Sequence, residues 1–141
     1  MTDRDKAVRK FRRAAEQRWL AARWLFGESP YYLDAIYLGG YAVECALKAL
    51  ILHRTPNRKF PDIYVEITSG QKAHDFEFLR GILRRKPINI VIPKSTMEEF
   101  RKVATWSTSL RYETKRIGYD VGSDFLSAVA RIRDWAEAEI Q

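Results

Sequence analysis

Cysteine and histidine are scarce in this 141-residue chain, which has one cysteine, Cys45, and two histidines, His53 and His74. A single cysteine excludes an intrachain disulfide, and we expect Cys45 to be a small buried thiol. Two well-separated histidines and one cysteine supply no zinc-ligand spacing, so we predict no metal site. A phosphate-binding glycine loop is also missing, because Gly39 and Gly40 lie within a helical pattern. The sequence therefore predicts no metal and no cofactor.

Long apolar runs are missing as well. No stretch is judged to reach the ~20 apolar residues of a membrane span, and arginines interrupt the first apolar run. We therefore expect no leader, no membrane partner and a cytoplasmic location. The chain does carry an excess of positive charge, with 25 Lys and Arg against 18 Asp and Glu, a net charge of +7. This excess favours anionic partners such as RNA, DNA or nucleotides.

The segment from Tyr31 to Arg54 is predicted to be the central helix, because its sequence leaves almost no face for water. On a helical wheel, the larger apolar residues form one face and the alanines form another, so other helices are expected to pack on both faces. Gly39 and Gly40 each cost a helix roughly 1 kcal/mol relative to Ala. Such a cost is usually retained where a neighbouring group or a ligand must come close, and we expect a close approach there.

A polar stripe runs along this otherwise apolar helix. Tyr37, Tyr41, Glu44 and Lys48 follow the spacing i, i+4, i+7 and i+11, which places them in one narrow band. The band is either a structural network or one wall of a binding site.

The remaining segments predict further helices. Residues 3–26 form an amphipathic helix, and the short connection after it makes an antiparallel hairpin with the central helix. Residues 55–70 carry two prolines and no sustained helical period, so they are interpreted as a loop with a possible short extended piece. His74 and Asp75 then open a third helix, with Asp75 as its N-cap.

A fourth helix is expected to begin with a capping box at Ser95 and Glu98 and to end near Ser109, and a last helix is expected to begin at Ser123. The loop between these two helices concentrates cations and aromatic residues, and surface loops often carry binding sites. We predict an all-α fold with a single domain of residues 1–141, built as an up-and-down bundle of four to five helices.

Three patterns carry a resemblance to a known family: the helix with the sequence YLGGYAVECALKALI, the pair His74 and Asp75, and Trp106 followed by Arg111 and Tyr112. Through them the chain resembles the HEPN superfamily over most of its length. The resemblance implies a HEPN-like helical bundle that is often a homodimer. It also implies one of three roles: helical partner of a nucleotidyltransferase, nucleotide-binding domain, or ribonuclease of toxin-antitoxin and defence systems.

In HEPN ribonucleases an Arg is followed after four to six residues by a His, and the two form the catalytic pair. Here the corresponding positions after Arg111 hold Arg116, Ile117 and Gly118, and no Arg precedes His53 or His74 at that spacing. Metal-independent RNA cleavage needs a group that can move a proton near neutral pH. The usual pair is therefore absent, and the catalytic residues stay unknown, with Arg111 and His74 as candidates.

Three functional hypotheses follow. The first is a module that binds a nucleotide or single-stranded RNA, with a nucleotidyltransferase as a possible partner; the others are a divergent ribonuclease and a structural interaction module. The binding hypothesis assigns ligand contact to nine residues: Tyr41, Glu44, Lys48, His74, Asp75, Arg111, Tyr112, Lys115 and Arg116. The alternative is a buried polar network in which Glu44 accepts from Lys48 or Arg111 while His74 caps its helix.

Overall fold

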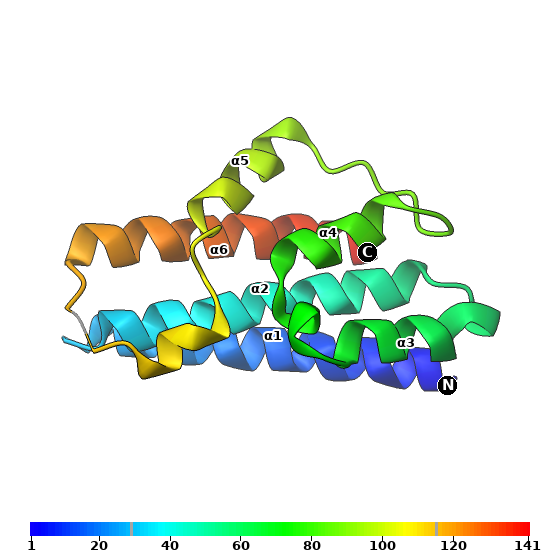
Figure 1. Cartoon of the computed structure of the whole chain (residues 1–141), viewed down its shortest axis with the longest axis horizontal. Helices are drawn as coiled ribbons and strands as arrows, with labels where there is room; N and C mark the ends of the chain where they lie inside the picture. The colour runs from blue at the N-terminus through cyan, green and yellow to red at the C-terminus, as the bar shows by residue number, and fades with distance from the viewer. Residues whose placement is uncertain (29, 115) are drawn as a thin grey trace.

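The computed structural model describes residues 1–28, 30–114 and 116–141, and these residues form six α-helices, three 3-10 helices and no strand. The long helices are α1 (Asp3–Gly27), α2 (Tyr32–Arg54) and α6 (Tyr119–Ile140), which lie side by side (Figure 1). The short helices between α2 and α6 are η1 (Asn57–Lys59), α3 (Phe60–Thr68), η2 (Gln71–His74), α4 (Phe76–Arg84), α5 (Lys94–Lys102) and η3 (Thr108–Tyr112). The predicted all-α bundle is confirmed.

Helix α2 is the centre of the bundle, as its sequence predicts. α1 and α6 pack along it, and α3, α4 and η3 contact it from other sides. By length and composition α2 is long and apolar enough to cross a membrane, which corrects the expectation that no stretch reaches that limit. However, 78% of its most apolar window is buried inside the protein, so these apolar side chains form the core of the bundle.

The direction of α6 differs from the prediction of an up-and-down bundle. Gly39 near the start of α2 faces Leu126 near the start of α6, while Arg54 at the end of α2 binds Glu139 near the end of α6. The two helices are therefore parallel, and α1 is antiparallel to both. This arrangement is possible because the short helices of residues 57–112 return the chain from the end of α2 to the level where α2 begins (Figure 1).

The segment interpreted as a loop is largely helical. α3 has a proline in its first turn, where the missing N–H costs nothing, and it buries Ile63 and Ile67, which are four residues apart. The alternation of Ile63, Val65 and Ile67 also fits a strand. However, Val65 is 59% exposed, so the burial follows the helical spacing of Ile63 and Ile67. The helix count rises beyond the predicted four to five for this reason.

Three of the predicted helix boundaries were wrong and one was confirmed. Asp75 caps α4 by accepting a hydrogen bond from the Glu77 amide at 2.9 Å, as predicted. The capping box at Ser95 is absent, because α5 begins at Lys94 after Pro93 and has no side-chain cap. α5 also ends at Lys102 rather than near Ser109, and α6 begins at Tyr119 rather than at Ser123.

Candidate ligand-binding site

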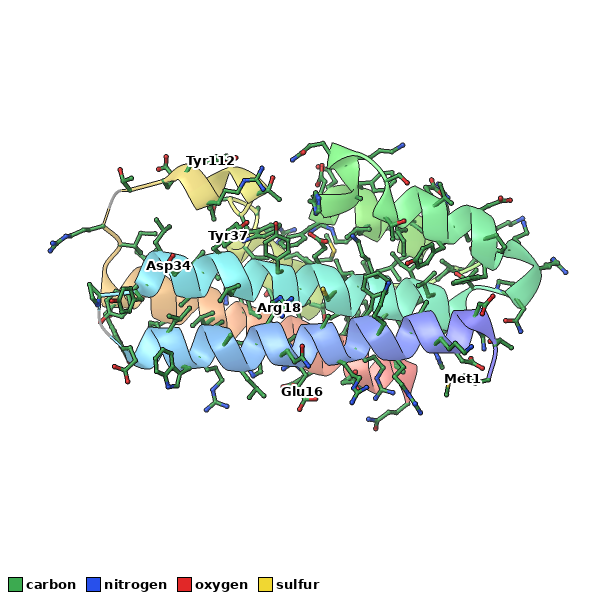
Figure 2. The ribbon with its side chains drawn as sticks, turned by 90° about the horizontal axis from the view of Figure 1, so that it is seen from below. Met1, Glu16, Arg18, Asp34, Tyr37 and Tyr112 are labelled. Atoms are coloured by element: carbon green, nitrogen blue, oxygen red, sulfur yellow. The ribbon has the colours of Figure 1, made fainter. Side chains whose placement is uncertain are left out.

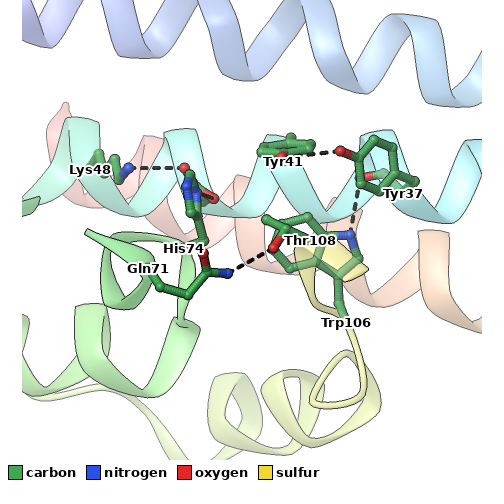
Figure 3. A network of polar contacts seen from close by, with 8 residues as sticks. Tyr37, Tyr41, Lys48, Gln71, His74, Trp106 and Thr108 are labelled. Atoms are coloured by element: carbon green, nitrogen blue, oxygen red, sulfur yellow. Dashed lines mark hydrogen bonds and ion pairs between the residues drawn. The ribbon is translucent and has the colours of Figure 1, made fainter. Parts of the chain in front are cut away.

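The polar stripe of α2 faces η2 and η3, and Glu44 is its centre. The Glu44 side chain is buried, with the residue only 4% exposed. Its Oε2 accepts a hydrogen bond from Lys48 Nζ at 2.9 Å, and its Oε1 lies 3.0 Å from His74 Nδ1 (Figure 3). Thus one carboxylate joins a lysine of its own helix to a histidine thirty positions away along the chain.

Charge compensation explains how Glu44 and Lys48 are tolerated inside the bundle. Lys48 is also only 4% exposed, and its ammonium lies 5.9 Å from the Phe11 ring centroid on α1. A buried charge is costly unless it is paired and hydrogen-bonded, and here the two charges form that pair. His74 extends the pair to the surface, because its own side chain is 37% exposed. Among the described residues, no partner binds its other ring nitrogen, Nε2.

Two tyrosines continue the stripe toward the start of α2. The hydroxyls of Tyr37 and Tyr41 lie 3.2 Å apart, and the Tyr41 ring meets the His74 ring edge-on with centroids 6.3 Å apart. Burial, followed by the hydrogen bond to Tyr37, raises the pKa of Tyr41 above the usual range of a phenol. Tyr41 therefore keeps its proton and can act as a hydrogen-bond donor.

Trp106 covers the stripe from the side of η3. Its Nε1 donates a hydrogen bond to the Tyr37 carbonyl oxygen at 3.0 Å, and its ring stacks on Phe76 at 5.1 Å and 6°. A Cβ atom at Gly40 would lie only 2.0 Å from this Nε1. The predicted close approach at Gly40 is confirmed, and the approaching group is an indole ring.

A hollow of about 350 Å³ lies beside His74 and Trp106. Gln71 Nε2 donates to Thr108 Oγ1 at 2.9 Å, which links η2 to η3 across this region (Figure 3). Most of the residues that line it are polar or charged; the lining consists of Gln71, Lys72, His74, Asp75, Ala104, Trp106, Ser107 and Thr108. Such a hollow offers hydrogen-bond donors and acceptors to a polar ligand.

An exposed cation and an exposed aromatic residue lie at the edge of the same region. Arg111 is exposed and its guanidinium lies 4.9 Å from the ring centroid of Tyr112, which is itself 74% exposed. The phenols of Tyr112 and then Tyr37 raise the pKa of Arg111. Figure 2 shows Tyr112 above Tyr37 on one side of the bundle. We call Tyr37, Tyr41, His74, Arg111 and Tyr112 the His74 face.

The structure brings together most of the site residues predicted from the sequence, but in altered roles. Tyr41, Glu44, Lys48 and His74 form one connected group; Arg111 and Tyr112 lie at its edge. The predicted acceptance by Glu44 from Lys48 is present, whereas among the described residues Glu44 accepts nothing from Arg111. His74 does not cap α4, because Asp75 does so, and His74 binds Glu44 instead.

One predicted cation, Arg116, lies outside this group. Arg116 lines an adjoining, more apolar groove of about 1000 Å³ between η3, α2 and α6, which also includes Tyr112 of the His74 face and Ser107 of the hollow. Lys115 lies outside the residues that the structure describes. Arg111 is therefore at the His74 face, and Arg116 is in the adjoining groove.

Sequence reasoning left four residues out of the predicted site: Tyr37, Gln71, Trp106 and Thr108. Tyr37 belongs to the predicted polar stripe, so its place in the sequence was a usable signal, but it was not among the nine predicted ligand contacts. Gln71 and Thr108 meet across 37 positions of sequence, and no local pattern marks that pairing.

The donor set gives no sign of a metal centre. Within residues 1–28, 30–114 and 116–141, no three His, Cys, Asp or Glu side chains gather as metal ligands would. Comparison of the chain with models of known protein families, with curated proteins and with solved structures found no match.

Proposed function

We propose that this chain binds a nucleotide or single-stranded RNA at the His74 face, in the manner of a HEPN-like binding module. The observation that carries the proposal is the position of His74. Its Nδ1 is fixed by the buried Glu44, so the ring is held in one orientation at the wall of a polar hollow. An imidazole that is oriented before a ligand arrives loses little side-chain entropy on binding.

The other groups of the His74 face suit the two halves of a nucleotide. Arg111 makes no ion pair within the described residues, and a guanidinium donates two parallel hydrogen bonds to a phosphate. Tyr112 exposes an aromatic ring on which a base can stack, an interaction worth about 1–3 kcal/mol per base. Tyr41 supplies a phenol that keeps its proton. The net charge of +7 assists the approach of an anion.

The binding test compares two arginine variants that lose the same charge. Labelled single-stranded RNA is titrated in EDTA across a salt series with wild type, Arg111→Ala and the control Arg58→Ala. Arg58 is also exposed and lies on η1, away from the His74 face. We expect Arg111→Ala to weaken binding about tenfold, because one guanidinium contact to a phosphate is lost. The slope of log affinity against log salt concentration should fall by about one for the same reason.

Arg58→Ala should change affinity by less than about twofold, and neither variant should lose much stability, because both side chains are exposed. Equal weakening by the two variants would assign binding to net charge alone and refute the proposed site. No retention of RNA or mononucleotide at low salt would refute the binding function itself, and would leave a structural or nucleotidyltransferase-partner role.

A second candidate, a divergent metal-independent ribonuclease, is favoured by the contact between Glu44 and His74. A carboxylate on one ring nitrogen orients the other nitrogen for proton transfer, as it does in catalytic triads. In such a reaction His74 Nε2 would take the proton of a ribose 2′-hydroxyl, whose oxygen attacks the adjacent phosphorus. The leaving 5′-oxygen would depart with a proton from water, and Arg111 would stabilise the charged phosphorane.

The same titration tests this candidate, because the RNA can be analysed for cleavage as well as retention. Cleavage in EDTA that His74→Ala and His74→Gln both abolish would support the ribonuclease. Retention without cleavage, or cleavage that persists in both variants, would remove His74 from any catalytic role.

A further inference from the structure

A second cluster of arginines lies far from the His74 face, in the angle between α1 and α6. Both helices pack on α2, and along the first half of α1 they leave a hollow of about 490 Å³ between them. Figure 2 shows Glu16, which lines this hollow, on the side of the bundle away from Tyr112. The described residues that line it are Met1, Asp5, Val8, Arg9, Arg12, Arg13, Glu16, Arg133 and Glu137. We call this the α1–α6 hollow.

The charges of the hollow do not cancel. Arg12 is paired with Glu137, which accepts hydrogen bonds from both its Nε, at 3.2 Å, and its Nη2. Asp5 forms an ion pair with Arg4 at 3.2 Å and takes part in the capping box at the start of α1. Once these pairs are set aside, the lining retains three guanidinium groups and one carboxylate: Arg9, Arg13, Arg133 and Glu16. None of the three guanidinium groups makes an ion pair with a described residue.

Arg133 carries part of this excess positive charge at a partly buried position. Its Nε is buried and has no hydrogen-bond partner among the described residues, and burial lowers the pKa of the side chain. Its guanidinium lies 5.6 Å from the ring centroid of Trp19, and Arg23 lies 5.9 Å from the same ring. A guanidinium whose face rests on an aromatic ring keeps its in-plane N–H groups for another acceptor.

We propose that the α1–α6 hollow is a second anion site, which binds a phosphate group through Arg9, Arg13 and Arg133. Arginine forks match the oxygens of a phosphate, and a group with two negative charges balances the excess that remains after the internal pairs are formed. Arg12, held by Glu137, keeps α1 and α6 in register beside the site. This site is separate from the His74 face and does not depend on the function proposed for that face.

The test uses inorganic pyrophosphate as the probe, titrated calorimetrically at low salt. Wild type is compared with the double variant Arg9→Gln and Arg13→Gln, and with a matched double variant, Arg58→Gln and Arg101→Gln. All four arginines are exposed, so both variants should fold, and both lose two charges. We expect the first variant to bind pyrophosphate at least about tenfold more weakly, and the matched variant to stay within about twofold of wild type.

Arg133→Gln supplies a third measurement, with its thermal melt as the check of folding, and should also weaken pyrophosphate binding at least tenfold. No binding by wild type, or equal weakening by the matched variant, would overturn the site. Arg111→Ala in the RNA titration reports on the His74 face, and the Arg9→Gln and Arg13→Gln variant in the pyrophosphate titration reports on the α1–α6 hollow, so failure here is distinguishable from failure at the His74 face.

Competition then identifies the source of the phosphate. RNA oligomers with a 5′-phosphate and with a 5′-hydroxyl are added to the pyrophosphate complex. Equal competition by both oligomers assigns internal phosphodiesters, and competition by the phosphorylated oligomer alone assigns a terminal phosphate. Competition by neither assigns a small phosphorylated molecule.

Discussion

Replacement of Gly40 by alanine is a direct test of how the site is built. In an isolated helix the change stabilises by about 1 kcal/mol, because alanine has the better helix propensity. In this protein we expect the opposite sign. The new methyl group would lie 2.0 Å from Trp106 Nε1 and 2.1 Å from the next ring atom, so the whole indole must move.

The size of the loss follows from the contacts that hold Trp106. Moving the ring breaks the hydrogen bond to the Tyr37 carbonyl oxygen and leaves a buried N–H unpaired, at a cost of about 1–3 kcal/mol. It also disturbs the stack on Phe76, worth about 0.5–1.5 kcal/mol. After the gain in helix propensity is subtracted, Gly40→Ala should lower the free energy of unfolding by about 2 kcal/mol.

Gly81 provides the matched control. It lies within α4, and a Cβ atom there would meet nothing within 4 Å. Gly81→Ala should therefore stabilise the protein by about 0.5–1 kcal/mol. Urea unfolding followed by circular dichroism measures both variants against wild type.

The expected loss of stability in Gly40→Ala comes entirely from one ring, so removal of the ring should remove the loss. In the background of Trp106→Ala, the further change Gly40→Ala should cost nothing or should stabilise. A Gly40→Ala variant as stable as wild type, or an equal loss with and without the indole, would show that Trp106 does not occupy the space above Gly40.

Two further predictions concern the interior of α2. Lys48→Met should lower the free energy of unfolding by about 3 kcal/mol, because it leaves the Glu44 carboxylate buried without its ammonium partner. The double variant with Glu44→Leu and Lys48→Met should recover most of that loss, and urea unfolding measures both variants. A single variant within about 1 kcal/mol of wild type would contradict the buried ion pair. Burial raises the pKa of the Cys45 thiol from 9.0 to about 11, so native protein should react with iodoacetamide at pH 9 about fiftyfold more slowly than urea-unfolded protein. Because the native thiol resists ionisation, stability should also fall as the pH rises from 9 toward 11, and a native alkylation profile with its inflection near 9 would refute this.

Features that depend on a single helix could be predicted from the sequence. The central position of α2, the need for space at Gly40 and the band from Tyr37 to Lys48 all follow from a single periodicity, and the structure agrees with each. Asp75 was likewise predictable as a cap, because capping is local. The apolar spacing in α3 was ambiguous, since residues at i, i+2 and i+4 fit a strand as well as a helix.

Features that depend on the path of the chain could not be predicted. The contact between His74 and Glu44 exists only because η2 lies beside α2. Trp106 contacts Gly40 only because α5 ends at Lys102, before the predicted end near Ser109. The α1–α6 hollow requires α6 to run parallel to α2, which places Arg133 opposite Arg12 and Trp19. No local pattern fixes that direction.

The placement of the short helices also has a consequence for folding. α1 and α2 are neighbours in the chain and can pair through contacts of short loop closure, whereas His74 and Trp106 reach α2 across 30 and 69 positions. The hairpin can therefore form while Glu44 and Lys48 are still hydrated. Their desolvation needs the arrival of η2 and of Trp106, so we expect the His74 face to be assembled only after the hairpin of α1 and α2 has formed.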